Sequence, residues 1–352
     1  MSSEPSDRPQ RASAAAFDIR LLDPTDAAAL AAWHRTYHDA HVFGLAHSTP
    51  RLLEEVRALL LTDSPGERRQ AFAGYVDEEP VVTGMLELPL MDNLETAQVM
   101  LATRPRSRGR GFGSAMLEHL VSLAGQHGRR TLQCEASWDY DAPADGAGTP
   151  GADFLTARGF RFALVDVKRV LDLPVNEELL DRLQQEAAPY SAGYTLRHFT
   201  GPVPEDILEG YGALVGSLMD QAPKGELEIE AEVYDAARIR ADEQVMAAAG
   251  RRRHATVATT ADGELVAYSE LAVPAHDPTR AFQWGTLVRP DHRGHRLGLA
   301  TKVHNLRTFQ AAEPGRTEVV TWNAEVNRPM VAVNEALGFR PVGRLGEFQK
   351  RL

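Results

Sequence analysis

The sequence contains a single cysteine, Cys134, among its 352 residues. One thiol cannot form an intramolecular disulfide or supply the thiolates of a structural zinc site. Because Cys134 lies in an apolar stretch, we expect a small buried residue. No apolar run approaches the length of a membrane span, and residues 1–16, which we expect to be a disordered tail, lack the apolar core of a signal peptide. These absences predict a cytoplasmic protein.

Positive charge is also in deficit, with 38 Lys and Arg against 49 Asp and Glu and a net charge of −11. Such a balance disfavours nucleic acid and anionic membrane surfaces as partners. His34 and His38 stand four residues apart, but the H-E-x-x-H pattern is missing. A zinc site would need further ligands, so we expect these histidines on a cleft wall or the surface and predict no metal.

A basic, glycine-bearing loop nevertheless occurs twice, each time between an apolar run and a helical pattern. One loop spans Arg108–Gly113 and the other Arg293–Gly298. A loop that opens a helix leaves backbone N–H groups without partners, and the helix dipole favours an anion there. Neither loop has the Gly-Lys-Ser/Thr ending of a Walker motif or the G-x-G-x-x-G spacing of a dinucleotide site. A small polyanion is therefore the expected ligand.

A second landmark repeats with the loops. The Gly-Phe pairs begin at Gly159 and Gly338, and their separation along the chain is nearly the same as that of the loop glycines Gly109 and Gly294. Two different motifs that both recur after nearly the same number of residues indicate a duplicated domain. We expect copy one at 17–174, a helical connector at 175–192 and copy two at 193–352. Helical and strand patterns interleave in the same order twice, which predicts two α/β domains with mixed, mostly antiparallel sheets flanked by helices. The strand patterns at 161–173 and 340–349 are expected to complete the sheets of their own copies.

The two loops and the C-terminal tail resemble motifs of a known family. Arg108-Gly-Arg-Gly-Phe-Gly113 fits the Q/R-x-x-G-x-G/A loop of the GNAT acetyltransferase superfamily, and Pro105 at its usual place adds to the fit. Arg293–Gly298 fits less well because Arg296 takes the place of a glycine. The tail from Asn323 to Phe339 looks like the family's last strand and helix. The resemblance covers nearly the whole chain as two tandem copies. This two-domain arrangement is similar to that of mycothiol synthase-like members of the family.

The resemblance implies acetyl-CoA as the cofactor and direct attack by an amine on the thioester. The glycine loop would bind the pyrophosphate, and the preceding strand would offer a backbone N–H to the thioester carbonyl, as in an oxyanion hole. In copy one the implied residues are Leu101, Ala102, Arg108, Gly109, Arg110, Gly111, Phe112, Gly113 and Ser114. In copy two they are Leu287, Val288, Arg293, Gly294, His295, Arg296, Leu297, Gly298, Leu299, Ala300 and Asn327.

The catalytic residues common in the family are missing. The strand glutamate is replaced by Ala97 and Phe282, and the tyrosine before Gly-Phe by Leu155 and Asn334. We take copy two as the catalytic unit, with Glu270, Asn323 and Asn334 as candidate residues. Glu87 is the copy-one counterpart of Glu270, and either glutamate could instead face solvent. Copy one, which has the better loop, would then be degenerate or structural.

An acidic face follows in copy two, where Glu226, Glu228, Glu230 and Glu232 alternate with apolar residues. This face could attract a cationic amine or simply be a solvated strand edge. The leading interpretation is an N-acetyltransferase for a small amine, acting as a monomer or homodimer. A non-catalytic acyl-CoA-binding scaffold and transfer of another acyl group remain alternatives.

Overall fold

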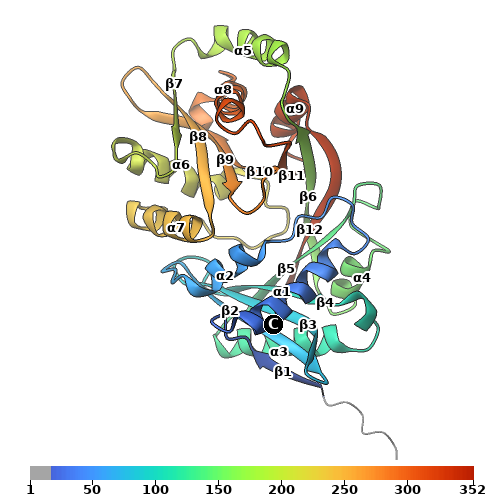
Figure 1. The fold of residues 1–352 in the computed structure, drawn as a ribbon. Coiled ribbons are helices and arrows are strands. Elements are labelled where there is room, and N and C mark those ends of the chain that lie inside the picture. Colours follow the sequence, from blue (N-terminus) through green and yellow to red (C-terminus); the bar gives the residue numbers. More distant parts are fainter. Residues whose placement is uncertain (1–16) are drawn as a thin grey trace, which may run out of the picture.

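The computed structural model describes residues 17–352, and Figure 1 shows their arrangement. The tail expected at 1–16 lies outside the described residues. Within residues 17–352, none of the helices combines the length and apolarity needed to cross a membrane. Two helix-flanked halves share one long sheet that runs through the whole molecule.

The first half alternates helices and strands as the sequence pattern indicates. Its strands are β1 (Phe17–Leu21), β2 (Glu67–Val76), β3 (Glu79–Pro89), β4 (Thr96–Thr103), β5 (Thr131–Asp139) and β6 (Arg161–Asp172). Its helices are α1 (Ala27–Val42), α2 (Leu53–Leu61), the short η1 (Pro105–Ser107), α3 (Phe112–Gln126) and α4 (Pro150–Thr156). The start of α1 follows from its N-cap, because the Asp26 carboxylate accepts from two backbone N–H groups.

The second half repeats this order after the linking helix α5 (Glu177–Ser191), which the Asn176 side chain caps as its sequence suggests. Its strands are β7 (Thr195–Thr200), β8 (Arg251–Thr259), β9 (Leu265–Pro274), β10 (Arg280–Val288), β11 (Glu318–Ala324) and β12 (Arg340–Arg351). Its helices are η2 (Glu205–Ile207), α6 (Leu208–Gln221), α7 (Ala236–Ala248), η3 (Pro290–His292), α8 (Leu297–Ala312) and α9 (Arg328–Leu337).

The two halves exchange their last strands. In the described chain the sheet order is β1-β2-β3-β4-β5-β12-β6-β11-β10-β9-β8-β7. The C-terminal strand β12 pairs with β5 of the first half, and β6 pairs with β11 of the second. Figure 1 shows β6 and β12 side by side where the halves meet. The expectation that residues 161–173 and 340–349 complete their own copies is therefore wrong, because local β pattern does not specify a pairing partner.

The exchange also joins the hydrophobic cores. Phe348 of β12 is 1% exposed and belongs to the same core cluster as Leu117 of α3 and Leu155 of α4. A side chain near the end of the sequence thus completes the core of the first half. Each half depends on the other for one strand and its buried side chains.

Both halves leave a gap in the sheet at corresponding places. The parallel pairing of β4 with β5 extends only from Thr96 to Gln98, and that of β10 with β11 only from Arg280 to Phe282. Beyond these pairs the strands diverge. The loops that follow β4 and β10 lie at the ends of these gaps.

Candidate active site

A cleft of about 1410 Å³ occupies the junction of the two halves. Its wall takes in the copy-one loop, the gap between β4 and β5, the exchanged strands β12 and β6, and parts of β10 and β11. A volume of this order exceeds that of typical small-ligand pockets, about 300–1,000 Å³. The cleft is therefore large enough for two substrates.

The copy-one loop opens directly onto this cleft. Gly111 is the N-cap of α3 with φ +88°, and Gly109 has φ +74°. No atom lies within 4 Å of the position that a Cβ would take at either glycine. No side chain caps α3, so its first N–H groups have no partner within the helix. Gly113 packs closely, since a Cβ there would lie 3.1 Å from Thr103 Oγ1. The result is an uncovered cradle of backbone donors.

Strand β4 presents one further backbone donor to the gap. Arg104 donates its N–H to the Val81 carbonyl of β3. Along an antiparallel strand, successive backbone N–H groups point alternately toward the paired strand and away from it. The N–H of Leu101 therefore points away from β3 and toward the gap. The N–H of Ala102 points toward β3. Of the two residues expected to supply this donor, the geometry favours Leu101.

The copy-two loop differs because side chains of neighbouring helices engage its residues. Arg293 donates to Gln221 Oε1 at 2.8 Å, His295 Nδ1 lies 3.2 Å from the Tyr190 carbonyl oxygen, and Arg296 forms an ion pair with Glu186. None of Arg293, Gly294, His295 and Arg296 lines the cleft. These four residues therefore form an exposed loop outside this cleft, and Gly294, with φ +88°, is as uncovered as Gly109.

The other copy-two residues predicted from the resemblance are largely internal. Leu297, Leu299 and Ala300 of α8 are buried in hydrophobic clusters. Arg289 donates its N–H to the Val266 carbonyl of β9. Because N–H directions alternate along an antiparallel strand, the N–H of Val288 points toward the gap and the N–H of Leu287 points toward β9. The other two predicted residues, Gly298 and Asn327, lie at the first turns of α8 and α9, where the Asn327 side chain accepts from Met330 N–H at 3.4 Å.

A network of polar side chains borders the copy-two gap. Lys302 donates to Asn334 Oδ1 at 2.6 Å, and Asn334 Nδ2 donates to Asn323 Oδ1 at 3.1 Å. Arg169 of β6 donates to the same Asn323 oxygen at 2.9 Å. Asn323 and Asn334, which we predicted to be catalytic, thus lie together in a buried network. Their amide groups are already engaged by neighbouring side chains.

Glu270, the third predicted catalytic residue, lies away from the cleft wall. It is 5% exposed, its Oε2 lies 3.1 Å from Arg253 Nε, and Tyr211 donates a hydrogen bond to it. Its carboxylate is thus engaged by Arg253 and Tyr211 inside the second half. The geometry of Glu270 therefore fits a structural role.

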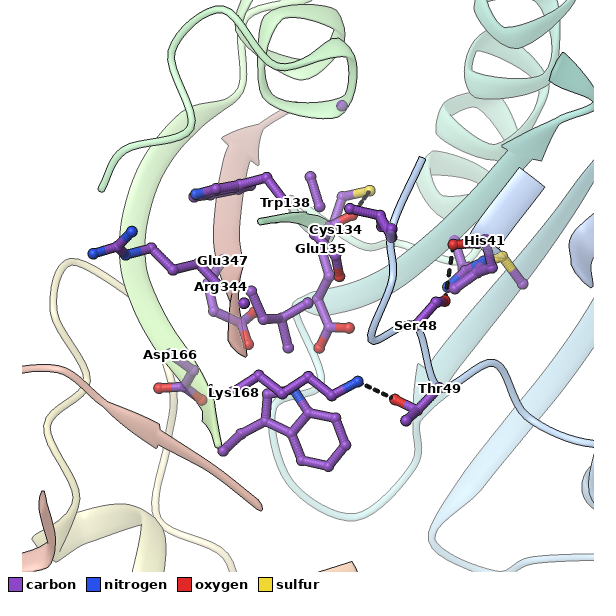
Figure 2. Close-up of a pocket in the computed structure, with 18 of the residues that line it drawn as sticks. His41, Ser48, Thr49, Cys134, Glu135, Trp138, Asp166, Lys168, Arg344 and Glu347 are labelled. Carbon is purple, nitrogen blue, oxygen red and sulfur yellow. Dashed lines mark hydrogen bonds between the residues drawn. The ribbon is translucent and has the colours of Figure 1, made fainter. Parts of the chain in front are cut away.

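A group of carboxylates faces the cleft where the exchanged strands meet the first half. Glu135 of β5 lies directly opposite Glu347 of β12, and Asp166 of β6 lies opposite the neighbouring Leu345. Figure 2 shows Glu135, Glu347 and Asp166 on adjacent strands around one space. We call these three residues the acidic cluster. The exchange of β12 and β6 brings it together.

The acidic cluster holds protons more tightly than ordinary carboxyls do. Burial, together with the neighbouring Glu135 and Asp166, raises the pKa of Glu347 to about 8. Burial raises the pKa of Asp166 to about 6, and it also raises the pKa of Glu135, with Glu87 and Asp166 adding to the effect. Like charges that face one another favour proton uptake. The cluster can therefore accept protons near neutral pH.

Cationic groups border the acidic cluster. Lys168 reaches across the cleft and donates to Thr49 Oγ1 at 2.8 Å (Figure 2). It also donates to the His47 carbonyl, and burial lowers its pKa to about 8. Arg51 lies 3.5 Å from Glu87. Although burial raises the pKa of Glu87, this guanidinium keeps it below its usual value. Glu87 thus faces the cleft as an ionised carboxylate, which resolves the alternative left open by its strand pattern.

A histidine and the cysteine complete the cleft wall. His41 lies in the cleft and burial lowers its pKa to about 4, so the ring is neutral at pH 7. Cys134 is buried as expected, and burial raises the pKa of its thiol to about 12. A thiol that remains protonated is a weak nucleophile. Across residues 17–352, no group of three or more His, Cys, Asp or Glu side chains is arranged to hold a metal ion.

The acidic face at 226–232 is not part of the cleft. Glu228 pairs with Arg351 at 2.6 Å, Glu230 accepts from Asn93 N–H at 2.9 Å, and Glu232 lies 3.4 Å from Arg238. The intervening Leu227 and Ile229 line the cleft instead. Glu228 and Glu230 thus attach the segment to β12 and to the loop before β4, Glu232 attaches it to α7, and its apolar side contributes to the cavity.

Sequence reasoning missed the acidic cluster and Lys168. Each lies on a strand that was correctly located, but their proximity depends on the exchange of β6 and β12. The available signal was the alternation of charged residues with apolar ones in 164–168 and 345–348. That alternation shows which residues share a face, but not which strands lie side by side.

Comparison with known proteins agrees with this geometry. Residues 30–144 match the model of the acetyltransferase (GNAT) family. A solved tandem GNAT protein from the clavulanic acid biosynthesis pathway superposes with a TM-score of 0.77 at 26% identity, covering 96% of this chain and 98% of that one. A GCN5-related N-acetyltransferase from Sphaerobacter thermophilus gives 0.63 at 16% identity, with 95% of each chain covered. A search of curated proteins finds no match.

These likenesses confirm the predicted fold class of two tandem GNAT-like domains, each with a mixed sheet flanked by helices. The family match covers the loop at 108–113 and the gap between β4 and β5. It ends within the loop after β5, before α4 and the exchanged strands.

Proposed function

We propose that this chain, whose residues 30–144 match the model of the acetyltransferase (GNAT) family, is an acetyl-CoA-dependent N-acetyltransferase for a small cationic amine. We place its active site in the first half. One observation carries the proposal: the uncovered cradle at Gly109 and Gly111 and the acidic cluster open onto the same cleft. A site for a polyanionic donor thus lies beside a site for a cationic acceptor.

The copy-one residues fit acetyl-CoA. No atom beyond the chain neighbours lies within 4 Å of the Cβ position at Gly109 or Gly111, and the uncapped start of α3 supplies N–H donors for phosphate oxygens. Residues 109–114 would hold the pyrophosphate, and Arg108, which stacks on Phe43 at 5.2 Å, would border it. When bound, the coenzyme would supply the acyl group as an activated thioester.

The chain's own residues would prepare the acceptor. An alkylamine is mostly protonated at pH 7, since its pKa lies near 10. The acidic cluster would bind the ammonium group, and Glu135 would accept its proton so that the free amine can attack. The N–H of Leu101, directed into the gap, would stabilise a developing oxyanion. Leu155, at the position of the family's tyrosine, is buried in the core and has no proton to give. The acidic cluster, which would hold the proton taken from the amine, would return a proton to the departing thiolate.

Two features support assigning the chemistry to copy one and not copy two. The copy-two loop is engaged by Gln221, Glu186 and the Tyr190 carbonyl, and the copy-two gap contains a polar network. Copy two would then support the site by supplying β12, with Glu347, and the cleft walls around Trp284 and Trp322.

The test is thiol release from acetyl-CoA with a panel of diamines, amino sugars, amino acids and neutral alcohols of similar size. We expect turnover with cationic amines, and roughly 100-fold lower kcat for Glu135→Gln, the range of a lost general base. Glu228→Gln, a carboxylate outside the cleft, is the matched control. Coenzyme binding without turnover for any acceptor would favour the non-catalytic scaffold, and turnover only with another acyl-CoA would change the donor.

A further inference from the structure

The copy-two gap contains two buried cations without an acidic partner among the described residues. Lys302 of α8 is 3% exposed and Arg169 of β6 is 4% exposed. Their recorded polar partners are amide and carbonyl oxygens: Asn334 for Lys302, and Asn323 and the Val167 carbonyl for Arg169. The two amides are themselves linked, so the four side chains form one network that carries excess positive charge.

This network leaves donor capacity unused. An ammonium group has three N–H donors, and Lys302 uses one of them, on Asn334 Oδ1 at 2.6 Å. The buried Nε of Arg169 has no hydrogen-bond partner. The Phe339 ring, centred 5.5 Å from Lys302 Nζ, gives partial compensation. Burying an unpaired charge costs several kcal/mol, and proteins usually compensate it with a counter-charge.

The network is specific to copy two. Counted from the matching loop glycines Gly109 and Gly294, Lys302 corresponds to Leu117. Counted from the two Gly-Phe pairs, Asn334 corresponds to Leu155. Both leucines are buried in the core of the first half. The same fold therefore closes this position with apolar side chains in copy one, so packing alone does not require the lysine and asparagine.

The cleft reaches this network. Lys302 and Asn323 both belong to the cleft wall. Beside them the wall is formed by Trp322, Met330 and Val342, which are mainly apolar, and by the hydroxyl-bearing Thr321. A ligand entering here would meet a cation at the end of an apolar passage. Burial lowers the pKa of Lys302 to about 7, and a bound anion would oppose that effect.

We propose that the copy-two gap is a binding site for a small organic carboxylate, held by Lys302 with Asn323 beside it, and with its apolar stem against Trp322 and Met330. The site is separate from the coenzyme cradle and does not depend on which amine is acetylated. The carboxylate belongs either to the acceptor or to a second small molecule, and both sources share this chemistry.

The test uses the small number of lysines in the chain. The sequence has four lysines, Lys168, Lys224, Lys302 and Lys350, so [¹³C]lysine-labelled protein gives few Cε signals to assign. We would titrate butyrate, succinate and inorganic phosphate into the full chain and follow these signals. We expect saturable movement of the Lys302 signal with the carboxylates and an upward shift of its titration midpoint by at least one pH unit.

Two variants make the result specific. Lys302→Met should lose carboxylate binding at least tenfold, measured by calorimetry, while Lys224→Met should retain it. Lys224 also lines the cleft but has an acidic partner, Asp220, at 3.1 Å. A Lys302 signal that ignores both carboxylates would overturn the proposal, and so would equal carboxylate affinity in wild type and Lys302→Met. Because the NMR titration uses wild type, it decides the question even if a variant fails to fold.

The two sources are then distinguished with thiol release from acetyl-CoA. If Lys302→Met raises KM for amino acids but not for their amides, the carboxylate is that of the acceptor. If butyrate binds to Lys302 without competing with the acceptor, it is a separate ligand. Failure of the acyltransfer proposal would leave the NMR result unaffected, so the two proposals can fail independently.

Discussion

Gly111 and Arg296 occupy the same place in the two halves. Each is the N-cap of the helix that follows the basic loop, and each has left-handed backbone geometry, with φ +88° and +50°. At Gly111 the space beyond the backbone is empty, whereas the Arg296 side chain is paired with Glu186 of α5. One position is thus uncovered in copy one and carries an exposed ion pair in copy two.

Exchanging these residues tests that difference. Gly111→Arg places a long side chain at the open cradle and adds backbone strain of about 1–2 kcal/mol. We expect KM for acetyl-CoA to rise at least tenfold. Arg296→Gly removes an exposed ion pair, worth about 1 kcal/mol or less, and should leave KM unchanged. Steady-state kinetics with acetyl-CoA varied checks both, and equal effects of the two substitutions would refute the assignment.

The acidic cluster predicts a pH dependence. A carboxylate is charged above its pKa, and Glu347 and Asp166 have raised pKa values of about 8 and 6. Attraction of a cationic acceptor should therefore weaken, and kcat/KM fall, as the pH drops from 8 to 6. Glu347→Gln should remove the upper step and leave the lower one. A profile identical to that of wild type would show that Glu347 does not take part.

The raised pKa of Glu347 also predicts how stability varies with pH. The folded state holds a proton on Glu347 up to about pH 8, whereas the ordinary value for Glu is 4.5. The folded state therefore binds more protons between these values, and the free energy of unfolding falls as pH rises through this window. Glu347→Gln should be more stable than wild type at pH 8 by on the order of 1–2 kcal/mol, and this gain should shrink toward pH 5. Urea unfolding at both pH values measures it.

Substitution of Glu270 should lower stability without changing catalysis. Glu270→Gln leaves Arg253 with one acidic partner, Glu243 at 2.9 Å, so we expect a loss of about 2 kcal/mol in unfolding free energy. The kcat of the folded variant should match wild type, because the carboxylate lies in a buried ion pair away from the cleft. A drop in kcat comparable to that of Glu135→Gln would restore Glu270 as a catalytic residue.

The strand exchange predicts that the halves unfold together. Phe348→Ala removes a fully buried ring of β12 from the core of the first half and should cost about 3–5 kcal/mol. Leu352→Ala, at the exposed chain end, should change stability by less than about 0.5 kcal/mol. Because β12 and β6 each join both halves, we expect one urea transition that moves as a whole. Two separate transitions, with only one displaced by Phe348→Ala, would argue against the interdependence.

Much of the fold is predictable because its signals are local. Glycines with positive φ mark the loop at Gly109 and Gly111, and the cap residues Asp26 and Asn176 mark helix starts. The pairing of β12 with β5 is not local, since it joins strands from opposite halves of the chain. No propensity or periodicity encodes such a partner.

The site was harder to predict for the same reason. Glu135 and Glu347 meet only through the exchange, so neither stands out in the sequence. The choice of copy two rested on its acidic face and on Glu270, Asn323 and Asn334, whose residue types suit catalysis. In the structure their side chains are engaged by Arg253, Lys302 and Arg169. Availability of a polar group depends on its neighbours, which residue type does not reveal.

The most direct test of copy-one coenzyme binding is a calorimetric titration of acetyl-CoA into wild type, Gly111→Arg and Gly298→Trp. The account predicts one site per chain in wild type, lost in Gly111→Arg and retained in Gly298→Trp. Two sites in wild type, or a single site lost only in Gly298→Trp, would contradict it and return the coenzyme to the second half.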